Sequence, residues 1–178
     1  MQARGLLMIE HRVIDRMIAV MADRVEHIRR AGDFDPHFVD VAVDFMGTYA
    51  DRTHHGKEEA ILFRDLGIRP LPGELRRQMD RLIEEHQWAR ETTIHLVGAN
   101  KRYRNGDPSA LSDIAETMQA LVEVYPDHMR REDTSFFPAA RALFSDAEDQ
   151  VMLQEFWDFD RGMIHEKYRA VVADLASI

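Results

Sequence analysis

Residues 54–63 read His-His-Gly-Lys-Glu-Glu-Ala-Ile-Leu-Phe, and residues 128–137 read His-Met-Arg-Arg-Glu-Asp-Thr-Ser-Phe-Phe. Both stretches fit the pattern His-x-x-x-Glu-acid-x-x-apolar-Phe. A separation of four residues along a helix puts the histidine and the glutamate on one face, one turn apart. Each stretch can therefore supply two ligands to a buried metal ion. The candidate ligands from these stretches are His54, Glu58, His128 and Glu132.

The first stretch contains a second pair with the same spacing, His55 and Glu59. Matching the final phenylalanines of the two stretches selects His54 and Glu58 instead. In an α-helix, His55 would then lie about 100° round the axis from His54. We therefore expect His55 and Glu59 to lie outside the set of metal ligands.

Two further histidines extend this pattern into an internal repeat. Glu10-His11 and Glu85-His86 are acid-His pairs within amphipathic segments. His11 precedes the histidine of the first stretch by 43 residues, and His86 precedes that of the second by 42. A single histidine or a single His-x-x-x-Glu is more often structural, but here both recur in register. In an antiparallel bundle such a repeat predicts a pseudo-two-fold axis with two equivalent metal positions.

Apolar residues at helical spacing, interrupted by Gly, Pro and Asn, predict five helices and no strand. The short connections between the first four make them antiparallel neighbours. We expect an all-α chain, an up-down-up-down antiparallel four-helix bundle with an additional C-terminal fifth helix. It would be a single domain, with the bundle at about 5–143 and the extra helix at about 145–176. The expected helices span about 6–30, 36–67, 73–104, 108–144 and 145 onward.

Composition narrows the function. The chain has 178 residues and a formal net charge of −9, which disfavours partners that are nucleic acids or anionic membranes. It has no cysteine, which excludes disulfides, iron–sulfur clusters and thiolate zinc sites. Any metal site must use histidine and carboxylate. Without a signal-peptide core or an apolar run of about 18 residues, we expect a cytoplasmic protein.

These motifs, HHxKEExxLF and HxxxEDxxFFP together with the two acid-His pairs, resemble the hemerythrin-like family with its His-His-Glu cation-binding domain. The resemblance covers roughly residues 5 to 143. It implies a non-haem di-iron centre with bridging carboxylates from Glu58 and Glu132. The terminal ligands that it implies are His11, His54, His86 and His128.

The chain also departs from the oxygen-carrying hemerythrins. Those proteins place two histidines one turn apart on the third helix, where this chain has Arg90 after His86. They also use an aspartate on the fourth helix, where this chain has Glu132. We therefore expect a site with four histidines and two glutamates, as in relatives linked to iron-centre repair, nitric oxide and peroxide chemistry.

The expected cofactor is two iron ions joined by an oxo or hydroxo bridge, with manganese or zinc as possible substitutes. The expected function is to bind or reduce a small oxidant (dioxygen, peroxide or nitric oxide), as a di-iron oxidoreductase with a reductase or a second copy as partner. The alternatives are an iron or redox sensor, or an iron-handling protein, signalling through the C-terminal helix, and a metal-free helical interaction module. A ferritin-like oxidase needs Glu-x-x-His on two helices, and the repeated positions lack that spacing.

Residues near these ligands carry weaker expectations. Tyr125 could hydrogen-bond to a bound ligand or to Glu58, or could serve only as a core residue. Asp15 and Arg90 hold equivalent positions in the repeat and could pair across the bundle. His27 and His95 should face away from the site, and His165 should be structural or on the surface. The residues expected to pack the core are Met8, Phe45, Phe63, Met118, Leu121 and Phe137.

Overall fold

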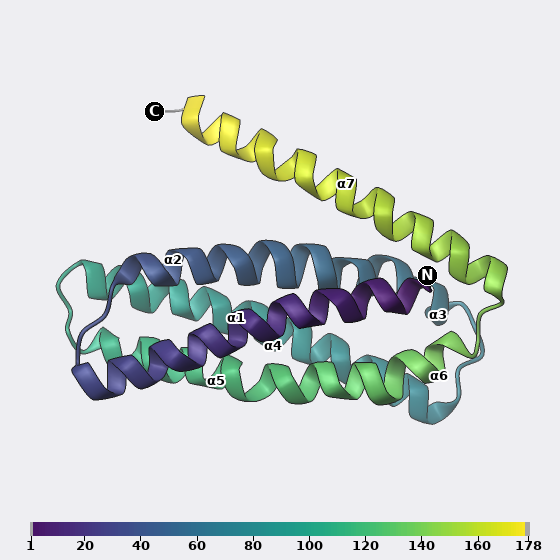
Figure 1. Ribbon diagram of the computed structural model, residues 1–178, viewed down its shortest axis with the longest axis horizontal. Coiled ribbons are helices and arrows are strands. Elements are labelled where there is room, and N and C mark those ends of the chain that lie inside the picture. The colour runs from purple at the N-terminus through teal and green to yellow at the C-terminus, as the bar shows by residue number, and fades with distance from the viewer. Residues whose placement is uncertain (1, 177–178) are drawn as a thin grey trace.

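The computed structural model describes residues 2–176, with side chains described up to residue 163, so His165 lies outside the described side chains. The described chain is helical and contains no strand, which confirms the all-α class. Five helical rods follow one another (Figure 1). They are α1 (Ala3–Ala31); α2 (Pro36–Phe45) with η1 (Met46–His55), η2 (Glu58–Phe63) and α3 (Arg64–Gly67); α4 (Gly73–Arg104); α5 (Ala110–Arg131) with η3 (Glu132–Phe136) and α6 (Phe137–Arg141); and α7 (Asp146–Ala176).

Local sequence signals set the ends of these rods. Gly32 ends α1 in the left-handed conformation, with φ at 70°, which glycine adopts without steric cost. The Asp35 side chain accepts a hydrogen bond of 2.9 Å from the His37 N–H and caps α2. At the start of α7, Glu148 accepts from the Ser145 N–H at 2.7 Å and donates its own N–H to Ser145 Oγ at 3.3 Å. This is a reciprocal cap, in which a serine and the glutamate three residues later satisfy each other's backbone N–H groups.

The first four rods lie alongside one another, and α7 crosses outside them (Figure 1). Helix α5 packs against α1 and α4, and α2 packs against α4. Helix α7 contacts α1, η1 and η2 near its start, and its later part diverges from the other rods. None of the described helices has an apolar stretch of the length that a membrane span requires.

The core consists of two apolar clusters. The first cluster includes Ile14 and Met21, and the second includes Leu7 and Phe136. His11 lies between Leu7 and Ile14 along α1, so a layer of polar side chains separates the two clusters. The predicted core residues are confirmed, since four are buried in these clusters and the other two pack partly buried against them: Phe63, Met118, Leu121 and Phe137, then Met8 and Phe45.

The rods change their winding where they pass this polar layer. η1, η2 and η3 are π-helical, with backbone hydrogen bonds to the residue five positions away. A wider turn rotates each successive side chain by less than the ~100° of an α-helix. Neighbouring residues in these segments can therefore face the interior together.

Candidate metal centre

Two groups of buried side chains converge in the polar layer between the apolar clusters. Within each group, the potential ligand atoms all lie within 4.8 Å of one another. The structure brings together all six residues that the sequence predicts as ligands and adds a seventh, His55. The first group is His11, His54, Glu58 and Glu132, and the second is His55, His86 and His128.

The two glutamates lie between the groups and face histidines of both. Glu58 Oε1 is 3.6 Å from His54 Nε2, while its Oε2 is 3.4 Å from His86 Nε2. Glu132 Oε2 is 3.2 Å from His11 Nε2 and 3.3 Å from His128 Nε2. Both carboxylates are fully buried. Each of them can therefore contribute to two metal positions at once.

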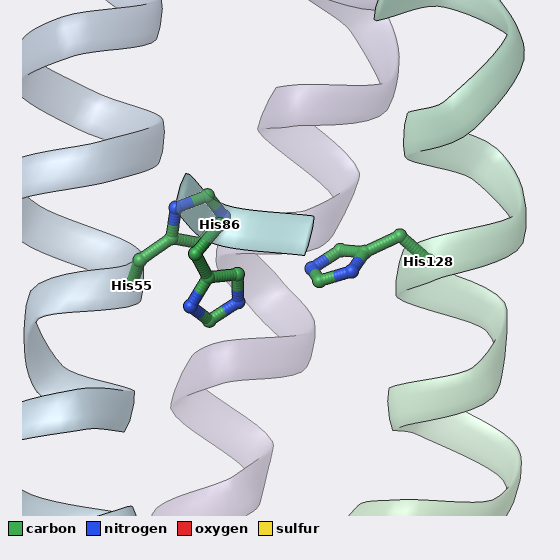
Figure 2. A group of neighbouring side chains, drawn as sticks. All are labelled: His55, His86 and His128. Atoms are coloured by element: carbon green, nitrogen blue, oxygen red, sulfur yellow. The ribbon is translucent and has the colours of Figure 1, made fainter. Parts of the chain in front are cut away.

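His55 corrects the sequence analysis. The prediction that it lies outside the metal ligands rests on α-helical geometry, whereas the structure places its buried side chain beside the ligands, with its ring stacked on that of His86 at a centroid distance of 3.8 Å. Figure 2 shows these two rings together, with His128 reaching toward them from α5. The physical reason is the π-helical winding of η1, which turns His54 and His55 inward together. A fifth imidazole thus enters from the second rod, although Arg90 replaces a histidine on α4.

Acidic side chains hold the imidazoles of the first half of the repeat. His11 Nδ1 lies 2.9 Å from Asp133, and His54 Nδ1 lies 2.9 Å from Glu10. When Nδ1 carries the proton and donates to a carboxylate, the Nε2 lone pair is free for a metal. Histidines that bind metals in proteins commonly have such a partner.

The second half repeats this arrangement. His86 Nδ1 lies 2.8 Å from Glu59, and His128 Nδ1 lies 2.8 Å from Glu85. Each of these acids stands next to one ligand in the sequence but contacts a histidine on another rod. Glu59 is therefore outside the ligand groups, as expected, but orients a ligand. The acid-His pairs and the acid after each Glu carried this signal in the sequence.

Cationic side chains neutralise the supporting acids. Lys57 contacts Glu10 and Asp160, and Arg131 contacts Glu85. Arg90 reaches two acids that support the second group of histidines: it donates to Asp51 at 2.6 Å and to Glu59 at 2.7 Å.

The expected pair of Asp15 and Arg90 is wrong. Asp15 is exposed on α1, whereas the Arg90 guanidinium is taken by Asp51 and Glu59 on the neighbouring rod. Asp51 is also 3.5 Å from His55 Nδ1. The position of Arg90 in the repeat correctly placed it near the site, but its partners are the acids of the neighbouring rod.

The side chains present fit a bound metal pair. Both oxygens of Glu58 and of Glu132, and the Nε2 atoms of His86 and His128, are buried without a hydrogen-bond partner. A buried polar atom that lacks a partner is costly, and a cation would satisfy all of these atoms together. In the first group, His11 Nε2 and His54 Nε2 are 2.9 Å apart. Two lone pairs at this distance need a proton or a metal ion between them.

Burial and the charges of neighbouring groups also shift the pKa values of these side chains in opposite directions. Burial and the charge of Glu132 raise the pKa of Glu58 well above its ordinary value. Burial also disfavours charge on Glu132, but His128, His11 and His86 outweigh it and lower its pKa. Burial lowers the pKa of His11, but its hydrogen bond with Asp133 and the nearby carboxylate of Glu132 raise it to about 9 overall. The buried carboxylates of this layer thus favour positive charge beside them, as a metal ion would supply.

Tyr125 lies in the core beside the second group, and His27 and His95 lie apart from both ligand groups, as expected. The Tyr125 ring is buried, 6.3 Å from that of His55 and 6.2 Å from that of His128, and burial raises its pKa. His27 pairs with Asp33 at 3.0 Å on the surface. His95 lies 3.3 Å from Thr117, apart from both ligand groups.

Comparison with known proteins agrees with this geometry. A sequence profile described as the Hemerythrin HHE cation binding domain matches residues 3–140. Uncharacterized proteins of Mycobacterium tuberculosis and Mycobacterium bovis are 25% identical to this chain over 173 residues, covering 97% of it and 67% of their own length. No solved structure matches the chain.

Proposed function

The chain belongs to the family of the hemerythrin HHE cation binding domain, and on that premise we propose that it binds two iron ions in a single-domain, up-down-up-down antiparallel four-helix bundle. One ion would be held by His11 and His54. The other would be held by the second group of histidines. Glu58 and Glu132 would bridge the two ions. The second group of histidines is His55, His86 and His128.

The observation that carries this proposal is the placement of the two glutamates. Each faces histidines of both groups, and the oxygens of both lack any hydrogen-bond partner. Two cations between them would satisfy these oxygens and the unpartnered imidazole nitrogens together. Imidazole and carboxylate without thiolate suit iron, and manganese or zinc could substitute.

The two positions differ in the number of protein donors. The His11 and His54 position has two imidazoles and the two shared carboxylates, whereas the other position has a third imidazole from His55. The first position therefore leaves more room for an outside ligand. Bound iron would supply the Fe(II)/Fe(III) couple and an open coordination position, with which the protein would bind or reduce dioxygen, peroxide or nitric oxide.

The chain's own groups prepare this position. Asp133 and Glu10 hold the imidazoles of His11 and His54 with their Nε2 lone pairs turned inward. The Phe137 ring stacks on the His11 ring with centroids 5.8 Å apart. Apolar clusters close both sides of the layer and limit the access of water. A small uncharged oxidant can cross such a core more readily than an ion can.

The test is anaerobic reconstitution with Fe(II), metal analysis, and then mixing with dioxygen, hydrogen peroxide and nitric oxide in turn. We expect two irons per chain and a new visible or near-ultraviolet absorption with at least one oxidant. Optical spectra that stay unchanged with all three would overturn the oxidant function. A chain that retains no iron would overturn the metal centre itself.

A sensor function is the second candidate, favoured by the contact between α7 and Lys57, which directly precedes the bridging Glu58. In that case, the exposure of α7 would follow the state of the metal. Limited proteolysis of metal-free, reduced and oxidised protein measures this exposure. Equal cleavage of α7 in all three states would reject the sensor function.

A further inference from the structure

Helix α7 reaches the polar layer at one point. Lys57 Nζ, which is fully buried, donates to Asp160 Oδ1 at 2.5 Å. The Asp160 side chain is 29% exposed and belongs to the outer helix, which carries none of the candidate ligands. The ammonium therefore lies between the ligand layer and α7.

The same ammonium also holds the acid that orients a ligand. Lys57 donates to Glu10 Oε1, and Glu10 Oε2 lies 2.9 Å from His54 Nδ1. Both oxygens of Glu10 thus have partners. A continuous chain of contacts runs from Asp160 on α7, through Lys57 and Glu10, to the imidazole of His54.

The second half of the repeat has the equivalent groups without α7. Arg131 stands where Lys57 stands, one residue before the bridging glutamate, and donates to both oxygens of Glu85 at 2.6 Å. Its side chain is 29% exposed, so water can solvate its charge. Lys57 has no such exposure, and a buried cation is tolerated when carboxylates surround it. Asp160 supplies the second carboxylate.

Apolar packing fixes α7 at this position. Phe156, one turn before Asp160, is fully buried in the second apolar cluster. Phe159 lies so close to Gly56 that a Cβ built on this glycine would be 2.8 Å from the Phe159 ring. Gly56 directly precedes Lys57 in sequence. The segment that carries the ligands His54 and Glu58 therefore packs directly against α7.

Resting on the proposed function, we propose that Asp160 is a positioning residue for the His11 and His54 metal position, and that it acts through Lys57 and Glu10. Without Asp160, Lys57 would turn toward water, and Glu10 would lose its fixed orientation. Binding at that position and docking of α7 then favour each other, since such a coupling acts in both directions. The position of His55, His86 and His128 would be unaffected, because other acids orient its imidazoles.

The test compares Asp160→Asn with Asp158→Asn in the full chain. Asp158 lies on the same helix but is 62% exposed and pairs with Arg161, so its substitution makes the same change in charge at the surface. Zn(II) is titrated into metal-free protein against a chelator, because zinc is redox-inert. Loss of an acid bonded directly to a metal-binding histidine commonly weakens metal binding by about 10- to 100-fold. Because Asp160 acts through two intervening residues, we expect Asp160→Asn to weaken one of two ions by up to about tenfold. Asp158→Asn should weaken neither ion.

Two results would overturn the inference while leaving the metal centre in place. The first is that Asp160→Asn binds both Zn(II) ions with wild-type affinity. The second is that Asp160→Asn and Asp158→Asn lose the same amount of Zn(II) affinity. A third variant tests the route: Lys57→Met/Asp160→Asn should bind no more weakly than Lys57→Met. A further loss in the double variant would mean that Asp160 does not act through Lys57.

If wild-type protein binds neither Fe(II) nor Zn(II), the proposed function fails, and the inference is decided in metal-free protein. Nitrogen chemical shifts of His54 report which ring nitrogen carries its proton. We expect the proton on Nδ1 in wild-type protein and a mixture of both forms in Asp160→Asn. Identical shifts in the two proteins would overturn the inference.

Discussion

The two halves of the repeat, residues 3–67 and 73–141, carry equivalent ligands and supporting side chains. They differ at one ligand and in the contact that one of them makes with α7. The acids before His11 and His86, the cations before Glu58 and Glu132, and the π-helical segments η2 and η3 occupy equivalent positions. However, η1 has no π-helical counterpart in α5, and α7 packs on η1 and η2. The repeat creates two groups of potential metal ligands, and its departures make the two groups unequal.

The largest loss of metal is expected when a glutamate that faces both groups of histidines is replaced. Glu58→Gln and Glu132→Gln should each lose both ions, because each carboxylate faces histidines of both groups. Metal analysis after reconstitution measures this loss. Metal-free Glu58→Gln should melt no lower than metal-free wild-type protein, since burial already favours the neutral form of Glu58. Metal-free Glu132→Gln should melt lower, because His11 and His128 lose a buried carboxylate partner.

Glu26→Gln is the matched control for these variants, because Glu26 is exposed and pairs only with its helical neighbour Arg29 among the contacts described. It should bind two ions, as the wild-type chain does. If either bridging variant keeps one ion at full affinity, that carboxylate serves a single position, and the two halves are independent.

The next largest effect on metal affinity is expected at His55, the ligand that has no counterpart in the other half. Met129 stands at the position equivalent to His55 and is also buried. His55→Met would make the halves alike, and we expect one ion to bind about 10- to 100-fold more weakly. Met129→His should leave the affinity of both ions unchanged, because α5 is α-helical here and turns residue 129 about 100° away from His128. Chelator competition measures both affinities, with the exposed His27→Met as the control. Unchanged affinity in His55→Met would exclude His55 as a ligand.

This difference also marks how far the sequence could predict the site. The five helices and the convergence of the six named residues follow from spacing, since helical periodicity and the His-x-x-x-Glu repeat are local patterns. The inward turn of His55 does not, because it depends on π-helical winding in η1. Rotation of 100° per residue assumes an α-helix, and nothing in residues 46–55 alone signals the wider turn.

The partners of the supporting acids were also beyond the sequence. Register in the repeat suggested Asp15 for Arg90, whereas the structure pairs it with Asp51 and Glu59. Pairing of this kind depends on which rods are neighbours and on how deeply each side chain lies. The contact between Lys57 and Asp160 joins residues 103 positions apart on separate rods. Such contacts have no periodic signal.

The smallest effect is on stability and concerns the cation before each shared glutamate, which α7 buries in the first half of the repeat only. Lys57→Met leaves Glu10 and Asp160 without their cation in a buried setting, and we expect it to lower the free energy of unfolding of metal-free protein by about 3 kcal/mol. Arg131→Met, its counterpart, removes a partly exposed guanidinium while Arg81 still pairs with Glu85 at 2.9 Å, so its cost should stay below about 1 kcal/mol. Urea unfolding monitored by circular dichroism gives both values. Equal costs would mean that α7 does not seal Lys57 from water in solution, and α7 would then make no difference between the two halves.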